Sequence, residues 1–185
     1  MELPKYILCL GMMCFYLTTK TQIEFNTVYE IDYIKEELSK AKANNDSASI
    51  GMAAYVLGGH LEWENGVSSE TIDLLVLSIQ CFAAVGDSAK YYQVRPNLAE
   101  HYIESKLYIE AEKILLEARS YYHRQKDFLM KMHMASRLGF LYQKMGDEKK
   151  TFQFKEESHE LNQIVGDTLV EIIYLIEKTQ VFQNE

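Results

Sequence analysis

Residues that end helices are scarce in this sequence. Among its 185 residues there are only two prolines, Pro4 and Pro96, and nine glycines. We find no run of four to eight residues that alternates between β-branched and polar side chains, as a half-buried strand would. Long stretches instead carry apolar residues three and four positions apart. This pattern predicts an all-α fold.

Positive charge and cysteine are limited as well. The net charge is −8, and no run of Lys or Arg supplies the basic stripe that nucleic-acid binding requires. The acidic balance suits solubility and is compatible with a basic partner. The three cysteines, Cys9, Cys14 and Cys81, match no zinc or disulfide spacing. Cys81 lies in an apolar helical run, where we expect a small buried hydrophobe rather than a nucleophile.

Residues 1–22 allow two interpretations. Residues 6–17 are uncharged and mostly apolar, Lys5 precedes them and polar residues follow, which is the outline of a secretory signal. Against this, Glu2 opposes the positive start and no A-x-A-like cleavage site is present. The alternative is a first helix packed on the rest of the chain. A signal would imply an exported, periplasmic protein, and a helix would imply a cytoplasmic one.

One aspartate recurs at a regular interval. Its copies are Asp46, Asp87, Asp127 and Asp167, so each copy follows the previous one after about 40 residues. Each precedes a long helix-like run, where its side chain can cap the first turn. A Leu-Gly or Leu-Ala pair follows at a constant offset, at Leu57-Gly58, Leu98-Ala99 and Leu138-Gly139. A period of this size predicts stacked helical hairpins, each too small to bury its own apolar face.

Local signals predict the elements of these units. In the first unit we expect a helix over residues 46–64, a turn at 65–66 and a second helix that Gly86 ends. The first helix of the second unit contains Pro96, which predicts a kink or a late helix start there. Residues 28–43 read as the second helix of an incomplete leading unit, and residues 167–182 read as a final helix.

The second unit resembles a tetratricopeptide repeat. It matches that family's pattern at Leu98, Ala99, Tyr102, Ala111, Leu115 and Ala118. The other units match in part, and the resemblance extends over residues 46–182. These units have about 40 residues instead of the family's usual length of about 34 and lack its closing proline. Such long units resemble those of bacterial sensory and regulatory proteins. The resemblance implies a right-handed α-solenoid over residues 23–185, with about three full repeats and flanking helices.

In that family the first helix of each hairpin lines a concave groove that binds peptides. Carried over by position, the candidate groove residues are Tyr55, Glu62, Gln93, Asn97, Glu100, His133, Arg137 and Phe140. Asn97 and Arg137 match the clamp with which chaperone-tail-binding members hold a terminal carboxylate, whereas Tyr55 and His133 depart from it. The residues themselves allow another reading, in which Arg137 pairs with Glu100 across the groove.

Aromatic side chains offer a second kind of contact. Trp63 and Tyr55 are candidate anchors for a bound peptide, because aromatic residues dominate interface energetics. The alternative, which we favour, is that they pack between neighbouring hairpins, where they would bury a large apolar area. The adjacent Tyr121 and Tyr122 leave the same two readings open.

No motif indicates catalysis. The five histidines never form a ligand pair at helical spacing, and no glycine-rich phosphate loop is found. We therefore expect no enzymatic activity, no cofactor and no metal site. The sequence predicts a non-catalytic module that binds a protein or peptide, as the input or scaffold region of a bacterial signal-transduction or transcription-regulatory protein. Nucleic acid would not be bound directly.

The final apolar run leaves an alternative function open. Residues 167–182 are apolar on more than one side, whereas the terminal repeat of a solenoid normally has a polar outer face. They could pair with a second subunit, which would make the protein a structural homodimer. We favour instead a chain that continues past Glu185, where the flanking sequence could supply a membrane tether.

Overall fold

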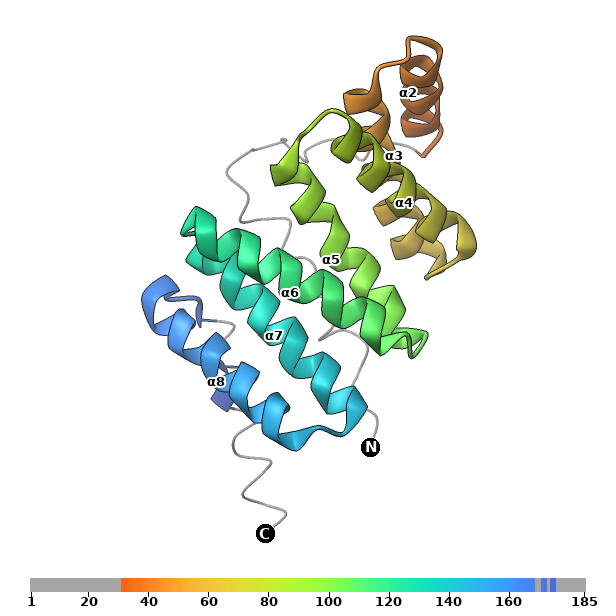
Figure 1. The fold of residues 1–185 in the computed structure, drawn as a ribbon. Helices are drawn as coiled ribbons and strands as arrows, with labels where there is room; N and C mark the ends of the chain where they lie inside the picture. The colour runs from red at the N-terminus through yellow and green to blue at the C-terminus, as the bar shows by residue number, and fades with distance from the viewer. Residues whose placement is uncertain (1–30, 169–170, 173, 176–185) are drawn as a thin grey trace. The chain divides into compact units, whose positions relative to one another are not determined.

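The structure is a computed structural model that describes residues 31–168, 171–172 and 174–175. This part contains seven α-helices and no strand, so the all-α prediction is confirmed for it (Figure 1). The helices are α2 (Ile31–Ala43), α3 (Ser47–Asn65), α4 (Ser69–Ala84), α5 (Ser88–Glu104), α6 (Tyr108–Gln125), α7 (Phe128–Met145) and α8 (Glu148–Val165). The two readings of residues 1–22 and the predicted start at residue 28 lie outside the described residues.

Each helix packs mainly against its neighbours in the chain. Contacts join α2 to α3, α3 to α4 and so on to α8, and α5 also touches α7. Figure 1 shows α4 to α8 following one another in chain order. Successive helices are joined by short turns, so α3 with α4, α5 with α6 and α7 with α8 form three hairpins. No helix in the described part is long and apolar enough to cross a membrane.

The recurring aspartates begin helices, as the sequence predicts. The side chains of Asp46, Asp87 and Asp127 each accept a hydrogen bond from the amide three residues further on, at 2.9–3.1 Å. Asp147 does the same at the start of α8, at 3.0 Å. After Asp167 the described residues are again helical, and its carbonyl accepts the amide of Glu171 at 3.2 Å. Each cap satisfies an amide that the first turn of the helix leaves without a partner.

The helix ends recur at half the interval of the aspartates. A residue with positive φ follows successive helices at Gly66, Gly86, Lys106, Lys126, Gly146 and Gly166. From Gly86 to Gly146, the residue after each one donates its amide to a carbonyl five positions back, at 2.8–3.0 Å. Those carbonyls belong to Phe82, Tyr102, Tyr122 and Tyr142. The backbone therefore repeats as one helix and one turn, which we call the half-period, and two half-periods make one period of the sequence.

Pro96 departs from one expectation. Helix α5 begins at Ser88 and passes through Pro96 without interruption, so the predicted late start is wrong. The proline has no N–H to donate to the carbonyl of Tyr92, which removes one bond from the helix ladder. Its ring is buried, and the apolar burial offsets part of that loss.

Small and apolar side chains fill the space between helices. Ala111, Leu115 and Ala118 of α6, three of the positions that match the repeat pattern, are fully buried. On α7, Leu138 and Leu141 are equally inaccessible. These residues position the first helices of the hairpins, on which the predicted groove residues lie.

Candidate partner-binding surface

All eight predicted groove residues lie on the first helices of the three hairpins. Tyr55 and Glu62 belong to α3; Gln93, Asn97 and Glu100 belong to α5; and His133, Arg137 and Phe140 belong to α7. Seven of them are half-buried, and Phe140 is exposed. We call these eight residues the groove residues below.

Four groove residues form one line of polar contacts across three helices. The amide nitrogen of Asn97 lies 3.3 Å from the hydroxyl of Tyr55, which joins α5 to α3. The oxygen of the same amide accepts a hydrogen bond from Nη2 of Arg137 at 3.4 Å, which joins α5 to α7. Arg137 Nε lies 2.7 Å from a carboxylate oxygen of Glu100. A single amide side chain thus contacts both neighbouring hairpins.

The Glu100 contact decides between the two readings of Arg137. The pairing of Arg137 with Glu100 across these helices, which the sequence leaves as an alternative, is present in the structure. The side chain of Arg137 is only 15% exposed. A peptide carboxylate would therefore meet a guanidinium whose charge Glu100 already balances. The geometry therefore disfavours a carboxylate clamp built on Asn97 and Arg137.

His133 lies one helical turn before Arg137 and cannot supply the missing positive charge. Burial and the nearby guanidinium of Arg137 lower the pKa of His133 to about 4. Both causes penalise the protonated imidazole. At neutral pH His133 is therefore uncharged, and Arg137 provides the positive charge at this end of the line of contacts.

Glu62 contacts a histidine that the sequence does not single out. His101 of α5 is buried, and its Nε2 lies 3.5 Å from a Glu62 carboxylate oxygen on α3. Burial alone would lower the pKa of His101, but the attraction of Glu62, Glu100 and Glu104 outweighs it and the pKa is raised. The two residues belong to different hairpins and are distant in the chain, so no local spacing reveals the pair.

The aromatic residues divide between packing and exposure. Tyr122 is buried, and Tyr121 stacks on Tyr92 with ring centroids 4.1 Å apart, so this pair packs between α5 and α6. Tyr55 takes part in the polar line described above. Trp63 is 68% exposed, so our favoured reading of it as a packed side chain is wrong. Trp63 lies near the end of α3, and its large apolar surface faces solvent.

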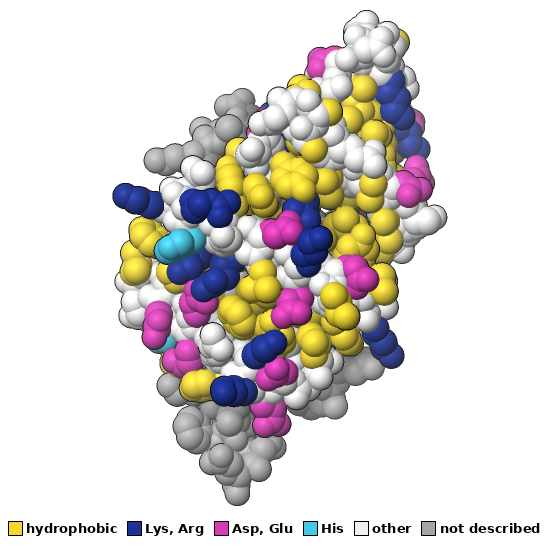
Figure 2. Space-filling view, viewed as in Figure 1, with side chains coloured by type: hydrophobic (Ala, Val, Ile, Leu, Met, Phe, Trp, Pro, Cys, Tyr) yellow, Lys and Arg dark blue, Asp and Glu magenta, His cyan; other side chains and the backbone are white. Residues whose placement is uncertain are grey.

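One face of the molecule is visible in Figure 2. Lys and Arg side chains alternate there with Asp and Glu, and hydrophobic side chains lie between them. Glu157 of α8 pairs both between and within hairpins: Arg119 of α6, in the preceding hairpin, binds it through two nitrogens, and Lys131 of α7, in the same hairpin, lies 3.3 Å from the same carboxylate. These charges hold hairpins together, which suits a structural role for them.

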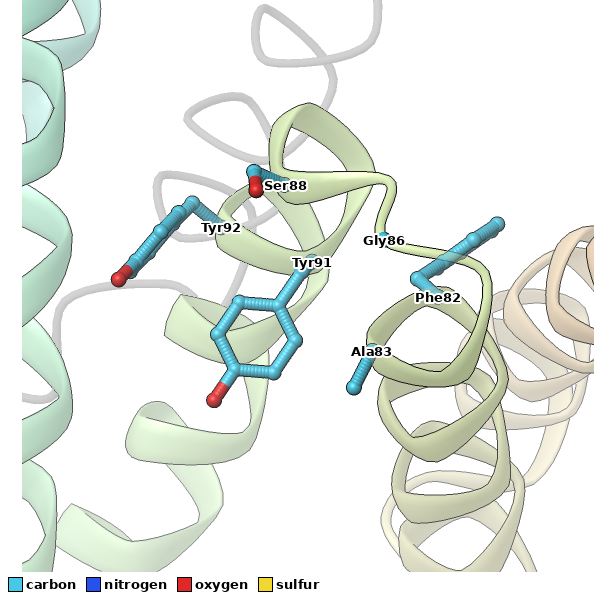
Figure 3. Close-up of a pocket in the computed structure, with 6 residues that line it drawn as sticks. All are labelled: Phe82, Ala83, Gly86, Ser88, Tyr91 and Tyr92. Atoms are coloured by element: carbon cyan, nitrogen blue, oxygen red, sulfur yellow. The ribbon is translucent and has the colours of Figure 1, made fainter.

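Two shallow depressions, both open to solvent, lie at turns that follow the α3–α4 and α7–α8 hairpins. The first has a volume of about 210 Å³ and is lined by Phe82, Ala83, Gly86, Ser88, Tyr91 and Tyr92 (Figure 3). The second, of about 380 Å³, is lined by Asn162, Gln163, Gly166, Asp167, Thr168 and Glu171. Neither contains a groove residue. No sequence pattern indicates either of them, because each combines residues from either side of a turn with side chains that also fit ordinary packing.

Groups typical of catalysis or metal binding are dispersed. Within residues 31–168 and the described positions beyond, no three His, Cys, Asp or Glu side chains gather in a way that could hold a metal ion. Cys81 is half-buried rather than fully buried, and burial raises the pKa of its thiol. A raised pKa reduces the thiolate fraction, which makes Cys81 a poor nucleophile at neutral pH.

Comparison with known proteins adds no assignment. The sequence matches no model of a known protein family, and no curated protein sequence matches it either. The candidate surface therefore stands on its own geometry.

Proposed function

We propose that the described helices form a right-handed α-solenoid of tetratricopeptide-like hairpins, and that the chain is a non-catalytic module that binds a protein or peptide. The observation that carries this proposal is the line of contacts from Tyr55 through Asn97 to Arg137. These residues are 42 and 40 positions apart on three first helices, where Asn97 and Arg137 match in position and Tyr55 lies one residue earlier in its unit. Contacts at matching places are what hairpins stacked side by side would make.

The surface along this line favours an extended peptide or a partner helix. Because Arg137 is paired with Glu100 and Glu62 lies beside His101, a ligand would meet charges that already have partners, together with the exposed ring of Phe140. Lys144 lies 5.0 Å from the centre of that ring and adds a cation beside it. The surface is thus amphipathic and carries charges of both signs, which suits a partner with mixed polar and apolar side chains.

The biological setting rests on the resemblance to long bacterial repeats. In that setting the chain is the input or scaffold region of a signal-transduction or transcription-regulatory protein. A partner that lies across α3, α5 and α7 would contact all three hairpins and could change the angles between them. The polar line would couple those changes, because Asn97 contacts both of its neighbours.

A second candidate function is structural homodimerisation through residues 167–182. The observation that favours it is the exposure of Ile172 and Leu175, which are 48% and 50% accessible. Replacing both by serine, as Ile172→Ser with Leu175→Ser, would then convert a dimer to a monomer in sedimentation velocity. An unchanged mass would count against this function.

Peptide selection tests the leading proposal. A random-peptide display library would be selected on the full chain, and the recovered peptides titrated against two variants, Phe140→Ala and Leu116→Ala. Both side chains are 38% exposed, but Phe140 lies on a first helix and Leu116 on the second helix α6. The matched exposure makes Leu116→Ala a control for general loss of apolar surface.

We expect Phe140→Ala to weaken binding at least about tenfold and Leu116→Ala to leave it unchanged, as truncation of an aromatic anchor should. Peptides that lose affinity equally in both variants, or a selection that enriches none, would argue against binding along the first helices.

A further inference from the structure

We propose that His101 is a pH-sensitive link between the first two hairpins. In its protonated form it holds the end of α3 against α5 through Glu62, and loss of the proton releases the end of α3. Three observations carry this inference: the burial of His101, the position of Glu62 across the hairpin boundary, and the other charges around the imidazole. The inference goes beyond the proposed function and holds whether or not the groove residues bind a partner.

His101 is a buried polar side chain without a hydrogen bond. The side chain is only 4% exposed, and within the described part of the chain neither ring nitrogen has a hydrogen-bond partner. Buried polar side-chain atoms usually have one, so a buried imidazole that lacks it requires an explanation. A neutral imidazole has one N–H donor and one acceptor nitrogen. Both would be left unsatisfied here, which disfavours the neutral form.

Glu62 lies where it can stabilise the protonated form instead. One of its carboxylate oxygens lies 3.5 Å from Nε2 of His101. This distance is too long for a good neutral N–H···O bond, whose usual range is about 2.7–3.2 Å. The attraction between an imidazolium and a carboxylate falls off more gradually with distance, and the burial of His101 strengthens it. The contact therefore depends on the proton that His101 carries.

The other charges close to His101 are mostly negative. Its own helix supplies Glu100 and Glu104, and both favour the protonated form. Arg137 of α7 brings a positive charge toward α5, but it pairs with Glu100 at 2.7 Å. Among the described residues, Glu62 is thus the acidic group that binds His101 from another hairpin.

The helices packed on α5 add no buried charge beyond these. Helices α4, α6 and α7 contact α5, and the side chains they bury in full are uncharged near neutral pH. The charged residues of α4, Glu70 and Asp73, are exposed. At the start of α6, Glu110 is exposed and Glu112 accepts a hydrogen bond from Tyr142 of α7.

These charges set the direction in which His101 titrates. Burial lowers the pKa of His101, but the attraction of Glu62, Glu100 and Glu104 outweighs burial, so the pKa is raised above its ordinary value of about 6.5. With a raised folded pKa, the stabilisation is fully present below the unfolded value and is lost as pH rises through the folded value. The link is therefore closed in mildly acidic solution and open at alkaline pH.

The link acts at the end of α3. Residues 63–65 are exposed, so Glu62 is the last residue of this helix that is partly buried. A second polar contact between the same helices joins the Asn97 amide to the Tyr55 hydroxyl at 3.3 Å, and both groups are uncharged. Tyr55 lies about two helical turns before Glu62. When His101 is neutral, this second contact still holds the middle of α3, and opening is confined to its end.

Two glutamates at the end of α3 allow a matched test. Glu62→Gln removes the carboxylate charge that binds His101. Glu64→Gln is the control, because it removes the same charge from the same end of the helix, where Glu64 is exposed. Neither side chain is fully buried, and glutamine forms helices nearly as well as glutamate, so both variants should fold.

NMR titration of the histidine ring protons in the full chain provides the first measurement. The signal of His101 is identified by its loss in His101→Gln. We expect this signal to titrate above the ordinary value of about 6.5. Glu62→Gln should move the titration to lower pH, and Glu64→Gln should leave it in place. A His101 titration that neither variant moves, or that both move equally, would overturn the inference.

Amide hydrogen exchange provides the decisive measurement. After correction for the intrinsic pH dependence of exchange, protection of residues 61–66 should fall by more than about threefold as pH rises through the His101 titration. Glu62→Gln should abolish this dependence, and Glu64→Gln should retain it. Residues 114–118 in the middle of α6 serve as the internal reference and should stay protected.

Two exchange results would contradict the link. The first is protection of residues 61–66 that stays constant across the His101 titration in the unmodified chain. The second is an equal loss of protection in the middle of α6, because the opening would then be global and would not be confined to the end of α3.

Discussion

Arg137 Nε lies 2.7 Å from a carboxylate oxygen of Glu100, and the two side chains are only 15% and 32% exposed. The pair connects α7 to α5 and therefore one hairpin to the next. Its partial burial makes it different from the ion pairs on the helix surfaces. A charge that has lost much of its hydration depends on its partner, because water can no longer replace that partner.

Removing the charge of Glu100 should therefore leave the partly buried guanidinium of Arg137 without a negative partner at this position. We expect Glu100→Gln to lower the free energy of unfolding by about 1–3 kcal/mol in urea titrations. Glu36→Gln is the control, since Glu36 pairs with Lys40 on the surface of α2 with both side chains more than half exposed. That change should leave the free energy of unfolding nearly the same, because exposed ion pairs add little. Equal costs for the two variants would show that the Arg137 pair has no special weight.

Two histidines should respond to pH in opposite directions. The pKa of His101 is raised by its acidic neighbours, so the stability it adds is present below its unfolded pKa and is lost as pH rises through the folded pKa. His101→Gln should therefore cost more stability at pH 5.5 than at pH 8. Urea titrations of both proteins at the two pH values measure this difference, and a cost that is larger at pH 8 would contradict it.

For His133 the sign is reversed. Its pKa is lowered to about 4, so the stability it adds is present above the unfolded value of about 6.5 and is lost as pH falls toward the folded value. The loss across this window is at most about 3 kcal/mol. His133→Gln should remove that dependence, and its unfolding free energy should fall less than that of the unmodified chain between pH 7 and pH 4.

Two glycines of α3 should behave differently when replaced by alanine. A Cβ at Gly51 would lie 3.1 Å from Cys81 Cβ and from the ring of Phe82, which is buried. A Cβ at Gly58 would meet Leu74 Cβ at 3.4 Å, an ordinary contact. Alanine gains up to about 1 kcal/mol of helix propensity at either site. Gly58→Ala should therefore be neutral or stabilising, whereas Gly51→Ala should lose about 1–2 kcal/mol to overpacking. Thermal unfolding of both variants provides the measurement.

The left-handed turn residues allow a paired test. Lys126 has φ 57° and Gly86 has φ 71°, and each occupies the same place after its helix. A side chain costs roughly 1–2 kcal/mol in this conformation. Gly86→Ala should lower stability by about 1 kcal/mol, and Lys126→Gly should raise it by about 0.5 kcal/mol, since glycine also gains freedom in the unfolded chain. A stabilising Gly86→Ala would contradict the strain argument.

The sequence predicts the helix starts better than the helix ends. Asp46, Asp87 and Asp127 cap helices as expected because a short carboxylate carries out this role by itself. The half-period is not visible in the sequence, because Lys106 and Lys126 adopt the conformation that sequence rules assign to glycine. A lysine in the sequence gives no indication that its φ is positive. The hydrogen bonds that close the turn fix this conformation.

Contacts across hairpins are only partly accessible from the sequence. The pairing of Arg137 with Glu100 could be given as an alternative because the repeat places both residues on neighbouring first helices. The pairing of His101 with Glu62 and the depression beside Tyr91 could not, since both depend on how far one helix slides along the next. The size of Trp63 alone favours packing, but the position of the turn after it leaves it exposed.

The half-period has a consequence for how a chain of this kind can lengthen. One helix and one turn reverse the direction of the backbone, so inserting a single half-period would make every later helix run the opposite way. Inserting a whole period would restore the direction. An internal duplication would therefore have to insert a whole hairpin. A single half-period could be added only at one end of the chain.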